Sequence, residues 1–203
     1  TPKPSSAASD VYKRQILSYT LKWSEAILRW GHVLFAILWV GNSFLFNYLD
    51  NKLNKDLKSE EIDGEGYLMH SGFYYKLQRL KTSPNKIFLN QLVIFKWQSY
   101  LTFITGILLL AVIYYYNAGI LMVDKRVLEL TPLTSISISI FSLIISWFVY
   151  DLMCKSKLIK NTSLFGFVML LLLVAISFIF TKIYGPKFAF LSVGLVIGTN
   201  MFM

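Results

Sequence analysis

The sequence feature that most restricts the fold is a series of apolar stretches, each about as long as a membrane-spanning helix. Crossing roughly 30 Å of hydrocarbon takes about 20 helical residues. Such stretches lie near residues 24–49, 97–116, 133–152 and 163–181, and a further one runs from 188 to 203. Hydrophobic residues make up 55% of the 203, and the mean hydropathy of +0.54 is unlike that of a soluble domain. We therefore predict an all-α, polytopic transmembrane helical bundle with four complete spans and a truncated fifth.

The two ends of the chain differ from these spans. Residues 1–15 are polar and patternless, so we expect a non-native, adaptor-derived or disordered segment there and give it no role. The last apolar stretch stops at Met203 without a polar flank, so we interpret residues 16–203 as the N-terminal part of a longer membrane domain. Residues 50–96 form a long aqueous loop between the first two spans.

Basic residues in the loops predict the orientation of the spans. Residues 50–96 and 153–162, which lie on one side of the membrane, contain eleven Lys and Arg, and the opposite side contains six. Cytoplasmic loops are enriched in Lys and Arg, so we expect both of these loops in the cytoplasm and the N-terminus in the periplasm. The positive charge therefore indicates topology and lipid contact, not nucleic-acid binding.

The first span carries polar groups along one face. Steps of three or four residues place side chains on the same side of a helix. The residues that follow this spacing are Arg29, His32, Ala36, Trp39, Ser43, Asn47 and Asp50. At 1.5 Å per residue, His32 and Asp50 are about 27 Å apart. They cannot belong to one site, so we predict an outer and an inner polar layer.

The outer layer consists of His32 and Arg29, with Ser192 at a similar depth. An intramembrane histidine usually faces the bundle interior and has a partner, so His32 is either a ligand of haem iron or another metal, or the donor of an interhelical hydrogen bond. Arg29 either supports such a cofactor site or extends to the outer headgroups. One cysteine, Cys154, excludes a C-x-x-C-H attachment site, so a haem bound here is a non-covalent b-type haem.

The inner layer contains residues suited to binding and proton transfer. We predict a catalytic group from the inner ends of the spans and the first loop: Asp50, His70, Trp97, Tyr100, Tyr150 and Asp151. The alternative is an interfacial aromatic belt with helix-end charges, and a solvated loop position for His70.

Two further segments have mixed signals. In the first loop, residues 64–81 place Tyr67, His70, Phe73, Tyr74 and Leu77 at helical spacing, which predicts an amphipathic helix on the inner interface. The serines in residues 134–147 alternate as in a strand, but the apolar length favours a helix in which they pack against neighbours. The sequence has no phosphate-binding loop, H-E-x-x-H motif or cysteine cluster.

Five blocks of the sequence resemble a known family. They are "RWGHVLFAILWVGNSFLFNYLDNKL", "MHSGFYYKLQRLK", "FKWQSYLTFITG", "SWFVYDLMCKSKL" and "AFLSVGLVIGTNMF". In their order and spacing they resemble the membrane domain of bacterial cytochrome-c-linked urate hydroxylases, the urate oxidase N-terminal family. The first block alone also resembles helix one of copper-resistance-D-like and membrane protoporphyrinogen-oxidase-like proteins, which keeps a b-haem interpretation open.

The resemblance implies a fold, a reaction and a partner. It implies an eight-helix domain in the bacterial inner membrane, of which this chain holds just over half, and a c-type haem only in a missing C-terminal domain. It also implies oxidation of urate to 5-hydroxyisourate, with electrons passed to a cytochrome c. Relatives carry a histidine where this sequence has Ser192, so His32 either pairs with a ligand elsewhere or does not belong to a bis-histidine haem site.

The residues and the resemblance together suggest roles for the two layers. Trp97, Tyr100 and Tyr150 would contact the planar urate ring, and Asp50 or Asp151 would handle protons, with His70 as a mobile polar group. Arg29 and His32 would serve the outer, electron-accepting layer. The alternative is a non-enzymatic b-haem or metal-binding membrane module.

Overall fold

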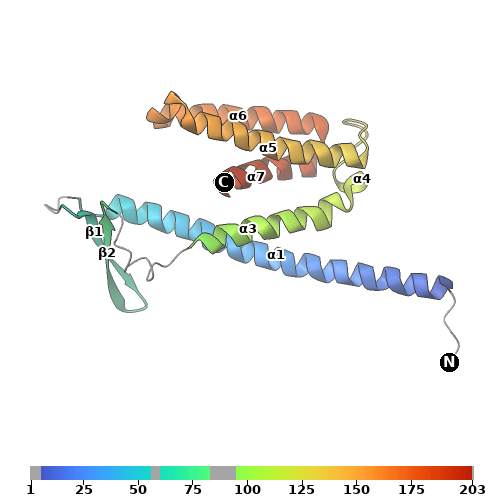
Figure 1. Cartoon of the computed structure of the whole chain (residues 1–203), viewed down its shortest axis with the longest axis horizontal. Coiled ribbons are helices and arrows are strands. Elements are labelled where there is room, and N and C mark those ends of the chain that lie inside the picture. The colour runs from blue at the N-terminus through green and yellow to red at the C-terminus, as the bar shows by residue number, and fades with distance from the viewer. Residues whose placement is uncertain (1–5, 56–59, 83–94, 203) are drawn as a thin grey trace. The chain divides into compact units, whose positions relative to one another are not determined.

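The fold is a set of long helices with one small β-hairpin. The computed structural model describes residues 6–55, 60–82 and 95–202 (Figure 1). Four of its helices are long and apolar enough to cross a membrane, which confirms the predicted all-α membrane architecture. The chain divides into two compact units, residues 1–32 with 100–203 and residues 33–99. Each unit is described by itself.

The first helix, α1, runs from Ser6 to Lys52 and has 47 residues. It begins well before the predicted start near residue 24 and takes in residues 6–15, which we interpreted as part of a non-native, adaptor-derived or disordered segment. The sequence has no proline between these ends, so nothing interrupts the backbone hydrogen bonds. Hydropathy locates the part of a helix that is apolar enough for the membrane, and it does not locate where the helix ends.

The first loop contains a β-hairpin, so the prediction of an amphipathic helix there was wrong. Strands β1 (Ile62–His70) and β2 (Phe73–Leu80) pair antiparallel, with His70 opposite Phe73. The turn is Ser71-Gly72, and both residues have positive φ, 50° and 82°. A two-residue turn of this kind matches the twist of paired strands and strongly favours glycine. The turn therefore decides the structure over the helical spacing of the aromatic residues.

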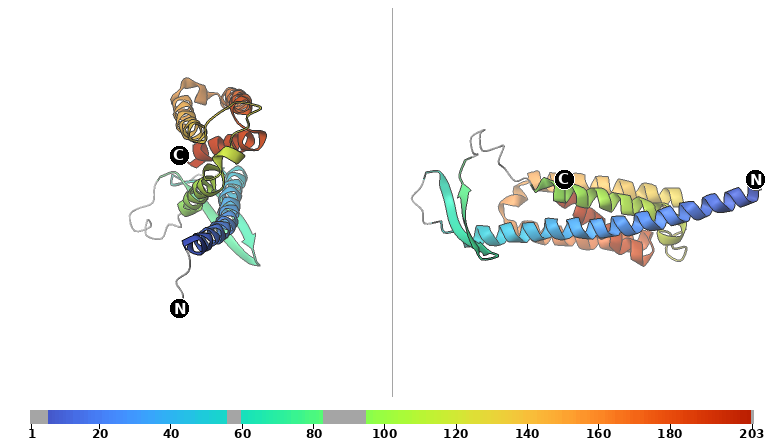
Figure 2. Two further views of the ribbon diagram at one scale, coloured as in Figure 1. Left: turned by 90° about the vertical axis from the view of Figure 1, so that its right-hand side faces the viewer. Right: turned by 90° about the horizontal axis from the view of Figure 1, so that it is seen from below.

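The hairpin is attached to the C-terminal end of α1, and its strands run across the helix axis (Figures 1 and 2). Asn54 and Glu65 exchange two backbone hydrogen bonds, of 2.8 and 3.1 Å. The Leu53 side chain packs against β1 at its two glycines, Gly64 and Gly66. A Cβ atom added to Gly64 would be 3.0 Å from the Leu53 Cβ, and one added to Gly66 would be 3.2 Å from its Cδ2. Glycine is therefore needed at both positions for this contact.

The second long helix, α3, runs from Lys96 to Leu109 and continues as a π-helical segment, η1 (Leu110–Tyr115). Its ends match the predicted span 97–116. The short helix α4 (Ala118–Leu121) follows.

Three further helices complete the chain, α5 (Pro132–Lys155), α6 (Thr162–Ile183) and α7 (Pro186–Phe202). A short 3₁₀ helix, η2 (Lys157–Lys160), connects α5 to α6. Their bounds agree closely with the predicted spans because each helix has a clear start signal. Thr131 caps α5 just before Pro132, and the Asn161 side chain caps α6 by accepting from the Leu164 N–H at 3.1 Å.

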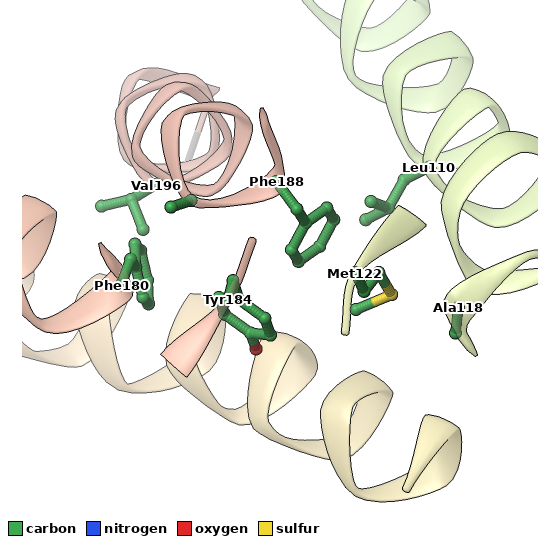
Figure 3. Close-up of a cluster of buried hydrophobic side chains, with 8 residues drawn as sticks. Leu110, Ala118, Met122, Phe180, Tyr184, Phe188 and Val196 are labelled. Carbon is green, nitrogen blue, oxygen red and sulfur yellow. The ribbon is translucent and has the colours of Figure 1, made fainter. Parts of the chain in front are cut away.

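The buried core lies in the unit of residues 1–32 and 100–203, where α7 packs against both α5 and α6 (Figures 1 and 2). Figure 3 shows its centre, in which Met122, Tyr184 and Phe188 are fully buried. The Tyr184 hydroxyl donates a hydrogen bond to the Ser135 carbonyl at 3.2 Å. Of the α5 serines that we expect to pack against neighbours, Ser135, Ser139 and Ser146 are buried, and Ser142 is half-buried.

Candidate functional site

His32 is fixed between α1 and α3. Its Nδ1 atom lies 3.0 Å from the carbonyl oxygen of Thr102 and 3.1 Å from the hydroxyl of Thr105. A carbonyl can only accept, so Nδ1 carries the proton and donates it, and Nε2 of the neutral ring is the basic nitrogen. Metal-binding histidines are commonly held by such a bond to a backbone carbonyl.

Gly106 on α3 leaves the space that the His32 imidazole occupies. A Cβ atom added to Gly106 would be 3.1 Å from His32 Cε1 and 3.5 Å from Nδ1, so any larger residue would press on the ring. Thr105 donates its own hydroxyl to the Leu101 carbonyl at 2.6 Å, which leaves its oxygen to accept from His32. These α3 residues were missed from the sequence, where the Thr and Gly of "LTFITG" were the available signal.

The other members of the predicted outer layer have separate partners. Ser192 is 3% exposed and donates its hydroxyl to the Phe188 carbonyl at 2.8 Å. Arg29 forms an exposed ion pair with Glu25 at 2.7 Å, one turn earlier on α1. Among the described residues, no group of three or more His, Cys, Asp and Glu side chains is placed to hold a metal ion. In the predicted outer layer, His32 is therefore the candidate axial ligand of a haem, and position 192 supplies no second ligand.

Asp50 is paired with the hairpin. Arg79 on β2 contacts Asp50 at 3.1 Å and also binds Asp63 on β1. The hydrogen bond to Asp63, followed by the one to Asp50, raises the pKa of Arg79 further above its usual range. Arg79 therefore joins both strands to the end of α1, a role that the sequence analysis did not assign. Asp50 has a structural partner in addition to its predicted role in proton handling.

His70 and Trp97 also belong to the unit of residues 33–99. His70 is exposed at the hairpin turn and lies opposite Phe73 in the strand pairing. Trp97 is 62% exposed in the first turn of α3, and the Lys96 ammonium lies 5.8 Å from the centre of its ring.

Tyr100, Tyr150 and Asp151 belong to the other unit. The Tyr100 ring meets the ring of Phe202 edge to face at 5.2 Å. Asp151 forms an exposed ion pair with Lys155 at 2.6 Å. Tyr150 lines a largely apolar cavity of about 300 Å³ between α5, α6 and α7, together with Asn200. Tyr100 and Tyr150 therefore both lie near the C-terminal end of α7.

Asn200 is an unsatisfied group in this cavity. Among the described residues, its Oδ1 atom is buried without a hydrogen-bond partner. Buried amide oxygens normally have a partner, which makes Asn200 a candidate for contact with a donor such as water or a ligand. The sequence analysis missed it, although an asparagine within an apolar helix was a visible signal.

A pair of side-chain amides also links α1 and α3. The Asn42 Nδ2 atom donates to Gln98 Oε1 at 2.6 Å, and both side chains are half-buried. This contact gives the polar stretch of α1 a partner. The one-face pattern did not include Asn42, so the prediction from helical spacing overlooked it.

Comparison with known proteins identifies the family. The family model described as urate oxidase N-terminal matches residues 18–203. No curated protein and no solved structure matches this chain. The match covers almost the whole chain and takes in most or all of each of the four described helices that are long and apolar enough to cross a membrane. The chain therefore belongs to the urate oxidase N-terminal family.

Proposed function

We propose that this chain is the membrane part of an oxidoreductase that oxidises urate to 5-hydroxyisourate. Urate and one water give 5-hydroxyisourate, two protons and two electrons. The electrons pass singly to a cytochrome c, either a separate protein or a c-type haem domain of the same polypeptide. The observation that carries this proposal is the family match over residues 18–203.

The proposed location is the bacterial inner membrane, with the N-terminus in the periplasm. Four described apolar helices of membrane-spanning length support a location in a membrane. The excess of Lys and Arg in residues 50–96 and 153–162 supports cytoplasmic loops at those places. Urate would then reach the protein from the cytoplasm, and the electrons would leave on the periplasmic side, where His32 and Arg29 are expected.

The proposed substrate side contains Trp97, Tyr100 and Tyr150 as aromatic surfaces. The cavity beside Tyr150 and the buried Asn200 oxygen support a polar contact at the inner end of α7. Asp50 and Asp151 are the proposed proton acceptors. Because both are paired with cations in this structure, each would exchange Arg79 or Lys155 for a new partner as it takes up a proton.

The test is urate-dependent reduction of cytochrome c by the full-length protein in nanodiscs. We expect reduction of two cytochrome c molecules per urate consumed, with 5-hydroxyisourate as the product in the ultraviolet spectrum. Absence of urate consumption in protein that is folded and supplied with oxidised cytochrome c would contradict the proposal.

A second candidate function, a b-haem or metal-binding module without urate chemistry, is favoured by one observation. The His32 Nδ1–H bond to the Thr102 carbonyl is the arrangement that orients a ligating imidazole. A Soret band that is lost in His32→Ala, in protein that does not consume urate, would support this alternative. An unchanged spectrum in His32→Ala would remove His32 from either role.

A further inference from the structure

A groove with both polar and aromatic lining residues lies between the C-terminal half of α1 and the start of α3. Its volume is about 540 Å³, and both of its walls belong to the unit of residues 33–99. One wall is a single face of α1, and the other is the first turn of α3 with the residue before it. The lining residues are Trp39, Asn42, Ser43, Phe46, Asn47, Phe95, Lys96, Gln98 and Ser99.

Two contacts join the walls and fix their separation. The first is the hydrogen bond from Asn42 to Gln98, at 2.6 Å. The second is an edge-to-face contact between the rings of Phe46 and Phe95, with centres 5.8 Å apart and an angle of 64°. One contact is polar and the other aromatic, so the groove has its shape before any ligand binds.

The lining combines aromatic surfaces with amide groups. Trp39, Phe46 and Phe95 supply flat apolar surface. Because Asn42 donates its side-chain nitrogen to Gln98, its side-chain oxygen is left as an acceptor, and Asn47 adds another amide to the lining. Such a set matches a flat ring whose edge alternates N–H donors and carbonyl acceptors.

The charge of the groove is positive. Lys96 is the cation among the lining residues, and no lining residue is a carboxylate. Asp50, the next acidic residue along α1, is paired with Arg79. The electrostatic field of the groove therefore favours an anion.

We infer that this groove binds a planar, anionic nitrogen heterocycle, the urate monoanion. The inference rests on the proposed function and gives it a site. The aromatic residues contact the ring surface, the amides pair with its N–H and carbonyl groups, and Lys96 compensates its charge. None of the residues predicted as catalytic from the sequence lines this groove, so in this inference the groove replaces Trp97, Tyr100 and Tyr150 as the surface that contacts the urate ring.

The first test places a negative charge in the groove. Asn42→Asp keeps the size of the side chain, and its carboxylate can accept a hydrogen bond from Gln98. We expect urate binding to the full-length protein in nanodiscs, measured by calorimetry, to weaken by about tenfold or more. Binding of hypoxanthine, a neutral purine of similar shape, should change by less than about threefold. Asn161→Asp is the matched control, because aspartate also caps a helix.

Two further variants separate charge from folding. Gln98→Glu places the same charge on the opposite wall, so a folding defect of one variant leaves the other to decide. Lys96→Met should weaken urate binding several-fold and reduce its dependence on salt, and Lys157→Met, with the same change outside the groove, should not. Helical circular dichroism and a single elution peak verify folding.

The outcomes distinguish this inference from the proposed function. Wild-type affinity for urate in folded Asn42→Asp, Gln98→Glu and Lys96→Met would overturn the groove as the site, while urate oxidation by the wild type would keep the function. A wild-type protein that neither binds nor oxidises urate would overturn both. Weaker urate binding with retained hypoxanthine binding would support the groove.

Discussion

Helices α5 and α7 and the unit of residues 33–99 treat polar side chains in opposite ways. In the helices, serine hydroxyls donate to carbonyls three or four residues earlier on the same helix. These bonds run from Ser137, Ser142, Ser146 and Ser192. In residues 33–99, Ser43 and Ser99 do the same, but longer polar side chains join different elements, as in Asn42–Gln98 and Arg79–Asp50.

This difference in hydrogen bonding separates a region suited to helix packing from a region suited to recognition of a polar ligand. A hydroxyl that is satisfied on its own helix places no demand on the neighbouring helix, so apolar packing joins α5, α6 and α7, with the Tyr184–Ser135 hydrogen bond as an added polar contact. An amide or guanidinium that reaches another element requires one particular partner at one particular place. Specific recognition of a polar ligand needs groups of that second kind, and for this reason we place the ligand site in residues 33–99.

The comparison predicts its largest effect in the helical core. Phe188→Ala should lower the free energy of unfolding by about 3–5 kcal/mol, because Phe188 is fully buried between Tyr114 and Tyr184 and truncation leaves a cavity. Thermal unfolding in detergent measures the change. The matched control is Phe190→Ala on the same helix, where the ring is 75% exposed and the loss should be less than about 1 kcal/mol. Equal losses in both variants would contradict the core as described.

The His32 contact breaks the pattern, because it is a polar link between α1 and α3 outside residues 33–99. Gly106→Val should cost about 1–3 kcal/mol of unfolding free energy by overpacking the imidazole. His32→Ala in the same background should recover part of the loss, since it removes the group that clashes. Gly166→Val is the control, because no atom lies within 4 Å of a Cβ at that position. A loss in Gly106→Val that His32→Ala leaves unchanged would mean that the ring is not the cause.

The sequence predicted the spans and missed the hairpin for a physical reason. The helices are determined by apolar length and by local caps such as Thr131 and Asn161, which are readable along the chain. The hairpin depends on the Ser71-Gly72 turn, and a Ser-Gly pair is a turn signal that the aromatic spacing obscured. Where a two-residue turn with positive φ competes with helical periodicity, the turn decides the structure.

The candidate site was predictable only in part. Helical spacing placed Trp39, Ser43 and Asn47 on one face, and all three line the groove. The opposite wall comes from the start of α3, and Gln98 is 56 residues from Asn42 along the chain. No local pattern connects such positions, so their contact depends on tertiary structure that periodicity does not encode.

The third prediction concerns the attachment of the hairpin to α1. Arg79→Gln should increase amide hydrogen exchange in β1 and β2 on the order of threefold to tenfold, because it removes the cation that joins Asp50 and Asp63. Arg126→Gln is the matched control, since Arg126 pairs with Asp124 two residues away and joins no separate elements. Unchanged exchange in Arg79→Gln would assign the attachment to the Asn54–Glu65 backbone pair and the packing of Leu53 on β1.

The smallest expected effect is a response of the hairpin to acid. Hydrogen bonds from Lys76 and then Gln78 hold the pKa of Glu65 below its ordinary value of 4.5. A carboxyl group whose pKa is lower in the folded state stabilises the fold above that ordinary value, and the contribution is lost as the pH falls through the folded pKa. Protection of the hairpin amides, corrected for intrinsic exchange, should therefore be constant from neutral pH to about 4.5 and then fall by less than about twofold, because the pair is exposed. Glu65→Gln should show lower protection at neutral pH and no further fall on acidification. If this variant keeps the wild-type acid response, another carboxyl group is responsible. The cross-strand ion pair would then not contribute to the link between the strands.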